Sequence, residues 1–244
     1  MKLTDPTLIA AVTSKWRGKR DAKNRPLVSD RTLKCLESAA IEEAWQVISD
    51  HGYHHNFAGD WTVLFPERVL VGRAITCRWV PIRPEVHQAI LQRGKKEKRI
   101  GFPNSWVIDE MVDGDVLVAD LFGQVNLVGD NLTTAIKANG GRGMVIDGGL
   151  RDLRRIEMIP EFCTYVKRIH PEGIPGVTMP EINGITRIGE ATCLPGDVVL
   201  GTRVGVIFIP PHLAGKVVHY SAQRRASRGR TSKKTTHNSE HLSR

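Results

Sequence analysis

A stretch of 24 residues, from Gly129 to Asp152, constrains the fold more than any other part of this 244-residue chain. It reads GDNLTTAIKANGGRGMVIDGGLRD, in which residues 131–139 have helical spacing and Gly140-Gly141 ends the helix. The apolar run after these glycines is typical of a buried strand. Such a unit can bring acids and a base that are distant in sequence to one edge of a sheet. That arrangement suits an enzyme that handles a small anion with a metal.

Three polar side chains of this stretch are candidates for chemistry: Asp130 at the predicted start of the helix, and Arg151 and Asp152 after the strand. A carboxylate at a helix start accepts free amide protons, and the amides of Asn131 and Leu132 could instead receive a substrate carboxylate. Arginine holds a carboxylate through two parallel hydrogen bonds, and aspartate is a hard oxygen ligand suited to Mg²⁺ or Mn²⁺. Spacing alone also fits a plain helix cap and an internal salt bridge.

The rest of the chain predicts more strand than helix. Helices are expected at 29–51, 84–94, 153–159 and 212–220, with a solvated loop at 93–99. Strands are expected at 69–80, 113–120, 143–149 and 164–170, followed by a β-meander over 185–211. Because the middle reads β-α-β and the end is all β, these patterns favour one compact α/β domain. The glycines of the central stretch follow a helix instead of opening one, so a dinucleotide-binding fold is not indicated.

The net charge of +9 is concentrated near the C-terminus. Residues 221–244 hold seven Lys or Arg and one acid, a net charge of +6, and almost no apolar residues. We therefore predict an N-terminal arm over 1–30, exposed over 16–26, a catalytic domain over 31–220 and a basic disordered tail over 221–244. The tail could bind a phosphate backbone weakly, but no aromatic residue interleaves with its arginines for stacking on bases. Nucleic acid is otherwise not an expected partner.

Hydropathy and cysteine spacing bear on the cellular location of the protein and on the state of its cysteines. No apolar run approaches the roughly 20 residues needed to cross a bilayer, and the N-terminus lacks the apolar stretch of a signal peptide. We therefore expect a cytoplasmic protein with no membrane contact. The four cysteines form no CxxC pair and no Cys/His cluster with zinc spacing. They are predicted to stay reduced, partly in the core.

Several motifs together resemble one family. The central stretch is similar to the main motif of the family that groups the class II 4-hydroxy-4-methyl-2-oxoglutarate / 4-carboxy-4-hydroxy-2-oxoadipate aldolases with the regulator of ribonuclease activity A (RraA). The aldolase branch carries an acid, twenty residues and then Arg-Asp, which Asp130, Arg151 and Asp152 match. The resemblance extends from about Ala39 to Val218, and it includes VGRAITC, DGDVLVAD and LPGDVVLGTRVGVIFIP.

The resemblance implies a fold and a role for each matching residue. The fold is a compact α/β/β sandwich of the swivelling phosphohistidine-like (RraA-like) type, assembled as homotrimers or hexamers with active sites between subunits. Arg151 would bind a keto-acid substrate and stabilise an enolate, Asp152 would hold Mg²⁺ or Mn²⁺, and Asp130 would hold or activate a water for proton transfer. The amides of Asn131 and Leu132 would grip the substrate carboxylate.

The activity implied by the resemblance is that of a divalent-metal-dependent lyase. It would cleave a C–C bond of a small anionic 2-keto acid, such as 4-hydroxy-4-methyl-2-oxoglutarate or oxaloacetate, through a pyruvate enolate. Two alternatives are a metal-dependent lyase or dehydratase acting on a sugar acid, and a non-catalytic ribonuclease-binding regulator. The sequence departs from the family at Arg155, where an acid is frequent, and at Asn131, where many members have leucine. These changes are expected to alter the substrate more than the enolate chemistry.

Overall fold

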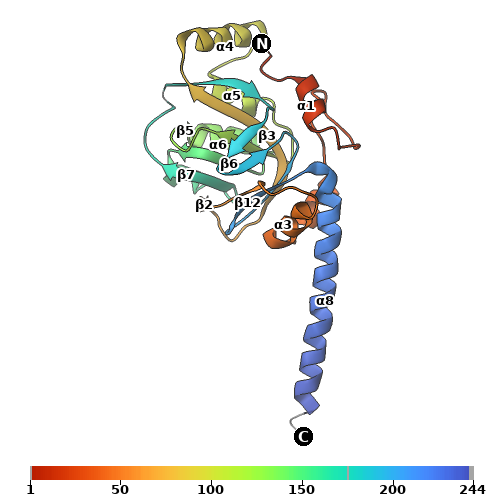
Figure 1. Cartoon of the computed structure of the whole chain (residues 1–244). Helices are drawn as coiled ribbons and strands as arrows, with labels where there is room; N and C mark the ends of the chain where they lie inside the picture. The colour runs from red at the N-terminus through yellow and green to blue at the C-terminus, as the bar shows by residue number, and fades with distance from the viewer. Residues whose placement is uncertain (1, 175, 242–244) are drawn as a thin grey trace.

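A large mixed β-sheet forms the centre of the computed structural model, which describes residues 2–174 and 176–241 (Figure 1). Four parallel strands form its middle: β3 (Leu70–Pro81), β4 (Asp115–Asp120), β6 (Gly143–Leu150) and β7 (Cys163–Ile169). Six more strands join them within the described residues: β1 (Phe57–Ala58), β2 (Thr62–Leu64), β5 (Asn126–Val128), β8 (Val177–Ile182), β11 (Val198–Thr202) and β12 (Gly205–Ile209). A small separate sheet contains β9 (Thr186–Ile188) and β10 (Ala191–Cys193). Because β5 runs parallel to the end of β6, the segments that follow both strands meet at one edge.

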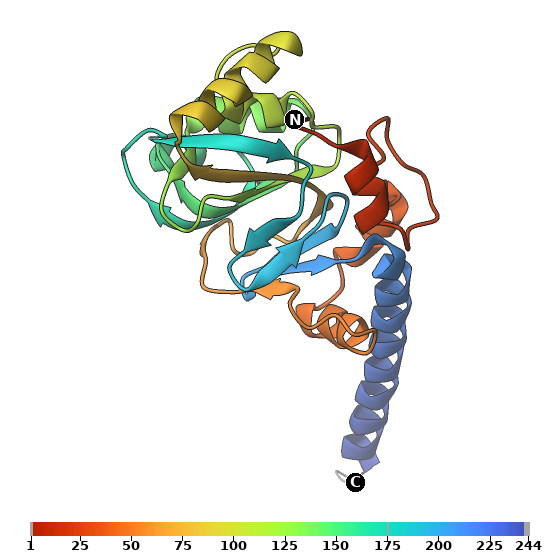
Figure 2. The same ribbon diagram turned by 45° about the horizontal axis from the view of Figure 1, so that its top comes forward.

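Helices cover the sheet on two sides. They are α1 (Pro6–Val12), α2 (Asp30–Leu36), α3 (Ile41–Ser49), α4 (Pro84–Lys96), α5 (Pro103–Ile108), α6 (Asp130–Ala138), α7 (Leu153–Ile156) and α8 (Ala214–His241), with a 3-10 turn η1 (Pro211–Leu213). Helices α4 to α7 pack over one face of the parallel strands and bury Leu117 and Ile146 (Figure 2). The alternate residues of these strands, such as Val116 and Val145, face β11 and β12 in a second core. Helices α2, α3 and α8 pack on the outer side of β11 and β12.

These layers confirm the predicted α/β class, and the differences from the predicted elements are local. The single helix expected over 29–51 is two helices, because the Glu43 carboxylate accepts the Ala40 N–H at 3.2 Å and starts α3 there. The solvated loop expected over 93–99 is wrong in its first half, because α4 continues to Lys96. The remainder is held by an ion pair between Arg99 Nε and Glu97 Oε2 at 2.8 Å.

The N-terminal 30 residues pack against the domain, so the prediction of an exposed arm is wrong. Leu3 and Ile9 are fully buried. Arg25 is 1% exposed and donates to Asp115 Oδ2 at 2.8 Å and to Asp21 Oδ2 at 3.1 Å. The basic, polar sequence of this segment predicts exposure, but Arg25 is buried because it pairs with the buried Asp115 at the start of β4.

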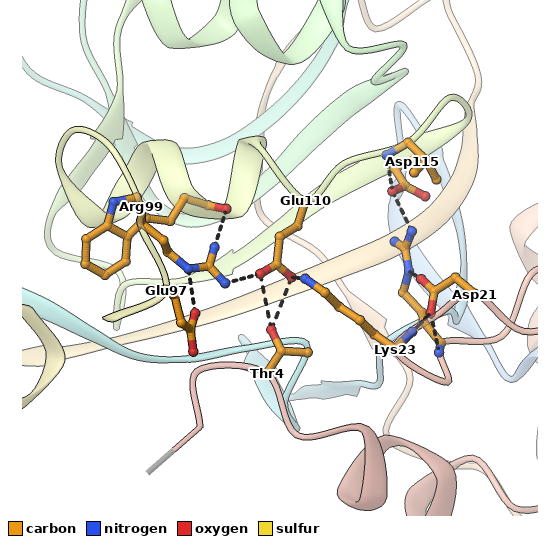
Figure 3. Close-up of polar contacts among 10 residues, drawn as sticks. Thr4, Asp21, Lys23, Glu97, Arg99, Glu110 and Asp115 are labelled. Carbon is orange, nitrogen blue, oxygen red and sulfur yellow. Dashed lines mark hydrogen bonds and ion pairs between the residues drawn. The ribbon is translucent and has the colours of Figure 1, made fainter. Parts of the chain in front are cut away.

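A second polar cluster joins the same segment to the region around α4 and α5 (Figure 3). Glu110 accepts a hydrogen bond from Thr4 Oγ1 at 3.1 Å and forms ion pairs with Lys23, at 2.8 Å, and with Arg99. Two of these partners, Thr4 and Lys23, lie more than 80 residues before Glu110 in the sequence. Local sequence patterns carry no signal for such long-range pairs, which is why the arm was expected to be free.

Helix α8 crosses the domain boundary predicted at residue 220 and projects away from the body of the molecule (Figure 1). Ser221 is buried and its hydroxyl donates to the Glu43 carboxylate, while Arg225 Nη1 donates to the Ser38 carbonyl at 2.8 Å. The structure therefore differs from the disordered tail predicted over 221–244, since alanine, arginine, lysine and glutamine all favour helix. Residues 242–244 of that tail lie outside the described residues.

Two further sequence predictions concern the membrane and the cysteines. Among the described residues, no helix is long and apolar enough to cross a membrane. All four cysteines are free; Cys77, Cys163 and Cys193 are buried, and Cys35 is exposed.

Candidate active site

A pocket of about 70 Å³ lies where β5 ends, α6 begins and the chain leaves β6. The register of β5 on β6 places Val128 opposite Leu150, so the residues just after each strand become neighbours. The pocket lining includes four of the predicted site residues: Asp130, Asn131, Leu132 and Arg151. The other lining residues are Asn104, Asn126, Leu127, Val128, Gly129, Gly173 and Ile174.

The N-terminus of α6 faces this pocket. Gly129 is the residue that caps the helix, and Asp130 is its first helical residue, so the helix begins one position earlier than predicted. The first backbone hydrogen bond within the helix runs from the Thr133 N–H to the Gly129 carbonyl at 3.1 Å. The amide of Asn131 is directed to the carboxylate of Asp130, which leaves that of Leu132 as the next amide in the turn. A helix start of this kind favours a bound anion.

Arg151 and Asp152 leave the end of β6 toward the same place. The Arg151 N–H donates to the Val128 carbonyl at 3.1 Å, which holds the turn against β5. Asp152 has a left-handed backbone with φ of 61°, a conformation that aspartate tolerates better than most residues. This bend brings its Oδ2 to 3.4 Å from Arg151 Nε. The internal salt bridge suggested by spacing is therefore present, and it lies beside the pocket.

Gly129 makes this close arrangement possible. A Cβ atom at this position would lie 2.3 Å from Asp152 Oδ2 and 3.0 Å from Arg151 Nε. Both side chains therefore rest directly over the backbone that caps α6. Backbone conformation does not require glycine here, since any residue adopts its φ of −123°. The requirement comes from the close approach of the two side chains.

Arg155 contributes a contact that the sequence did not predict. Its Nη1 donates to Asp130 Oδ2 at 3.1 Å. This hydrogen bond is the main cause of a lowered pKa for the Asp130 carboxyl, and the Asn131 amide and the Asp152 side chain act in the same direction. Asp130 is ionised at neutral pH, and because the lowered pKa makes it a weaker base, its carboxylate suits holding a water better than accepting a proton itself. The family departure at Arg155 thus bears directly on the candidate acid.

Two asparagines of the pocket were missed by sequence reasoning. Asn126, which is 4% exposed, donates through Nδ2 to the carbonyls of His170, at 2.6 Å, and Glu172, at 2.7 Å. These bonds hold the segment that brings Gly173 beside the Arg151 guanidinium. Asn104 on α5 donates to the Leu127 carbonyl at 3.2 Å. Neither asparagine lies in a motif with a distinctive spacing, so no sequence signal would have found them.

The donor set at the pocket fits a hard divalent cation that keeps most of its water. Asp152 and Asp130 supply carboxylate oxygens beside each other, and Mg²⁺ is commonly bound by one or two carboxylates together with waters or substrate. Within the part of the chain that the structure describes, no group of three or more His, Cys, Asp or Glu could hold a metal. A dry, all-protein metal cage is therefore not what these residues form.

A helix N-terminus, an arginine and two carboxylates gather at the carboxyl ends of parallel strands, an arrangement of the α/β class that suits a small anion. Residues 38–208 match the model of the RraA-like family, described as Aldolase/RraA, and the chain belongs to this family. The family prediction made from the central stretch and its flanking strands is therefore confirmed.

Two curated relatives carry an aldolase name. A protein of Halalkalibacterium halodurans named "Putative 4-hydroxy-4-methyl-2-oxoglutarate aldolase" is 29% identical over 123 residues, which is 48% of this chain and 56% of that protein. A protein of Pseudomonas paraeruginosa with the same name is 30% identical over 118 residues, 46% of this chain and 72% of that protein. The match thus spans little more than half the length of the first relative. Both names associate the family with lyase chemistry.

Solved structures share the fold. RraAS2 of Streptomyces coelicolor, described as an unusual member of the RNase ES inhibitor RraA protein family, has a TM-score of 0.72 at 21% identity, covering 85% of this chain and 100% of that one. An uncharacterized protein from Pseudomonas syringae pv. tomato has a TM-score of 0.70 at 19% identity, covering 86% and 90%. At such identities the likeness concerns the fold alone, and it confirms the predicted RraA-like sandwich.

Proposed function

We propose that this protein is a divalent-metal-dependent lyase that cleaves a carbon–carbon bond of a 2-keto acid, such as 4-hydroxy-4-methyl-2-oxoglutarate or oxaloacetate, through a pyruvate enolate. The observation that carries the proposal is the gathering of Arg151, Asp152 and Asp130 around Gly129, at the N-terminus of α6. The names of the curated relatives support the same class of reaction.

The keto-acid end of the substrate would bind between α6 and Arg151. The amides of Asn131 and Leu132 belong to the first turn of the helix, which has no carbonyl partners within α6, and the carboxylate would be received there by the Leu132 amide and by the Asn131 amide in place of Asp130. Arg151 is half-exposed to the same space and can donate two parallel hydrogen bonds to the keto-acid oxygens. As the bond breaks, negative charge grows on the former keto oxygen. A guanidinium already fixed there stabilises this charge more in the transition state than in the ground state.

Proton transfer falls to Asp130. A 4-hydroxy acid loses its hydroxyl proton as the bond breaks, and the resulting enolate must gain a proton at carbon. Arg155 binds one oxygen of the ionised Asp130 carboxylate, and the carboxylate would hold a water that takes up the first proton and returns one to the enolate. Asp152 would hold a Mg²⁺ or Mn²⁺ ion, which supplies positive charge near the enolate oxygen when bound.

A direct test follows pyruvate release from oxaloacetate and from 4-hydroxy-4-methyl-2-oxoglutarate, with Mg²⁺ or Mn²⁺ and with EDTA. We expect turnover that EDTA abolishes and that Arg151→Ala reduces by about 10²- to 10³-fold, since it removes a transition-state donor. Arg154→Ala is the matched control, because this exposed neighbour on α7 does not line the pocket. Activity that survives EDTA would remove the metal from the mechanism, and an active Arg151→Ala variant would remove the assigned role.

A second candidate is the non-catalytic, ribonuclease-binding regulator. The fold shared with RraAS2 and the basic helix α8 favour it. Wild-type protein that releases no pyruvate but binds a ribonuclease in a pull-down with purified partners would establish this candidate. Turnover of a sugar acid, without turnover of either keto acid, would instead point to the dehydratase alternative. We also propose a homotrimer or hexamer with sites between subunits, which light scattering of the purified protein would test.

A further inference from the structure

A second cavity, of about 230 Å³, lies on a part of the molecule that shares no lining residue with the candidate active site. Its walls come from the end of α1, the loop after α3, strand β10 with the turn before β11, and the start of η1. Figure 2 shows α1 and the first turns of α8 on the same side of the molecule. The lining residues are Val12, Thr13, Ser14, Lys15, Tyr53, Asn56, Thr192, Leu194, Asp197, Pro210, Pro211 and His212.

This cavity depends on segments outside the matched family region. Residues 12–15 belong to the N-terminal segment and residues 210–212 to the start of η1, which precedes α8, whereas the family match covers 38–208. The N-terminal segment is held in place by the buried pair between Arg25 and Asp115. The wall that this segment forms is therefore held in place by buried contacts of the N-terminal segment.

Positive charge collects at one side of the cavity without a counter-charge. Lys15 Nζ donates to Tyr53 Oη at 3.1 Å, and Tyr53 Oη lies 3.4 Å from His212 Nε2. Lys216 Nζ lies 2.7 Å from His51 Nε2. Burial, together with Lys15, Lys216 and His51, lowers the pKa of His212. No carboxylate forms an ion pair with Lys15, Lys216 or His212 within the described part of the chain.

The one acid that lines the cavity does not oppose a bound anion near neutral pH. Asp197 is 2% exposed, and its Oδ2 accepts the Leu194 N–H at 2.8 Å. Its Oδ1 is buried and has no hydrogen-bond partner among the described residues. Burial raises the pKa of Asp197 to about 8. At pH 7 the group is largely protonated, so it adds no negative charge and retains a hydroxyl that can donate.

The remaining walls are mainly apolar, with Thr13, Ser14, Asn56 and Thr192 adding uncharged polar groups, and they set the size of a ligand. Val12, Leu194, Pro210 and Pro211 supply the apolar part, and the ring of Tyr53 closes one side. An apolar cavity of about 150 Å³ holds benzene. The larger volume here accommodates a six-membered ring that carries one carboxylate.

We propose that this cavity binds a small organic carboxylate with a compact apolar body, and that Lys15 and Tyr53 receive the carboxylate. The site is separate from the proposed lyase site and does not depend on the lyase proposal. Lys15 provides the charge and the Tyr53 hydroxyl a hydrogen bond, while Lys216, which acts on His212 from the same side, keeps the surrounding potential positive. The prolines and Leu194 bury the body of the ligand.

Benzoate is the probe, and benzamide is its uncharged counterpart of nearly equal shape. Isothermal titration of the full-length protein at pH 7 should give one benzoate per chain, with benzamide at least about fivefold weaker, since one partly screened charge contact is lost. Lys15→Gln should weaken benzoate binding by about fivefold or more. Lys19→Gln is the matched control, because Lys19 lies on the same segment but does not line the cavity.

Two further variants keep the outcome clear. Ser14→Trp should fill the cavity from its exposed rim and abolish benzoate binding without disturbing a buried residue. Arg151→Ala should leave benzoate binding unchanged, because Arg151 belongs to the other pocket. The proposal is overturned by equal affinities for benzoate and benzamide, by a Lys15→Gln variant that binds like wild type, or by loss of binding in Arg151→Ala. Absence of saturable benzoate binding below about 20 mM, the weak end of specific affinity, would also overturn it.

Discussion

Replacing Gly129 with alanine isolates the geometry of the candidate active site from its chemistry. The new Cβ would lie 2.3 Å from Asp152 Oδ2 and 3.0 Å from Arg151 Nε. Ordinary contacts between such atoms are about 3.5 Å, so the Asp152 carboxylate has to move by roughly 1 Å. A misplacement of about 1 Å costs on the order of 10²-fold in rate. We therefore expect kcat/KM for pyruvate release to fall by about two orders of magnitude.

The same substitution should leave the fold intact. Gly129 has a φ of −123°, which alanine adopts without strain. The atoms that would clash are the ends of the Asp152 and Arg151 side chains, and these can swing away. Alanine caps a helix less well than glycine but also restricts the unfolded chain, and each effect is about 1 kcal/mol or less with opposite sign. The melting temperature should stay within about 4 °C of wild type.

The assay compares steady-state pyruvate release with thermal unfolding followed by circular dichroism. Gly215→Ala on α8 is the matched control, since nothing lies within 4 Å of the Cβ it would add. A folded Gly129→Ala protein with wild-type kcat/KM would refute the requirement for Arg151 and Asp152 to rest over Gly129. An equal loss of activity in Gly215→Ala would show that the assay responds to something other than the site.

Three further predictions concern buried groups. Arg25→Met should lower the free energy of unfolding in urea by about 3 kcal/mol, because it strands the buried Asp115 carboxylate; an unchanged midpoint would contradict the docked N-terminal segment. The folded-state pKa of Asp197 is raised to about 8, so its contribution to stability is fully present below pH 4 and is lost as pH rises to 8. Asp197→Asn should therefore gain stability over wild type across that window, on the order of 5 kcal/mol, and parallel stability curves would refute the raised pKa. Native protein should expose one thiol, Cys35, to a disulfide reagent and four in urea, because burial raises the pKa of Cys77 to about 12; rapid reaction of more than one native thiol would contradict this.

The elements that the sequence placed correctly are those whose signal is local. The strand over 143–149 and the helix over 131–139 follow from apolar spacing and from the glycines between them, which neighbouring residues fix. The helix predicted over 29–51 was divided differently because continuous apolar spacing does not reveal that Glu43 binds the Ala40 amide. The exposed arm was wrong because composition describes how polar a segment is, and not whether Arg25 meets a buried acid.

The same division holds for the candidate site. Spacing and family resemblance picked out Asp130, Arg151 and Asp152, and the structure brings these three together beside one pocket. Sequence reasoning did not identify Asn126, which holds a distant segment against the pocket. The comparison with the family motif marked Arg155 as a departure from the family, but it did not indicate that the Arg155 guanidinium binds Asp130.

The sequence by itself determined the family, the α/β class and which charged side chains stand at the end of the central strand, because these follow from order and spacing along the chain. Only the tertiary structure decided that Gly129 lies beneath Arg151 and Asp152 and that the N-terminal segment closes a second cavity. Both depend on contacts between residues far apart in sequence. Such contacts are set by how strands pair and layers pack, which no local pattern records.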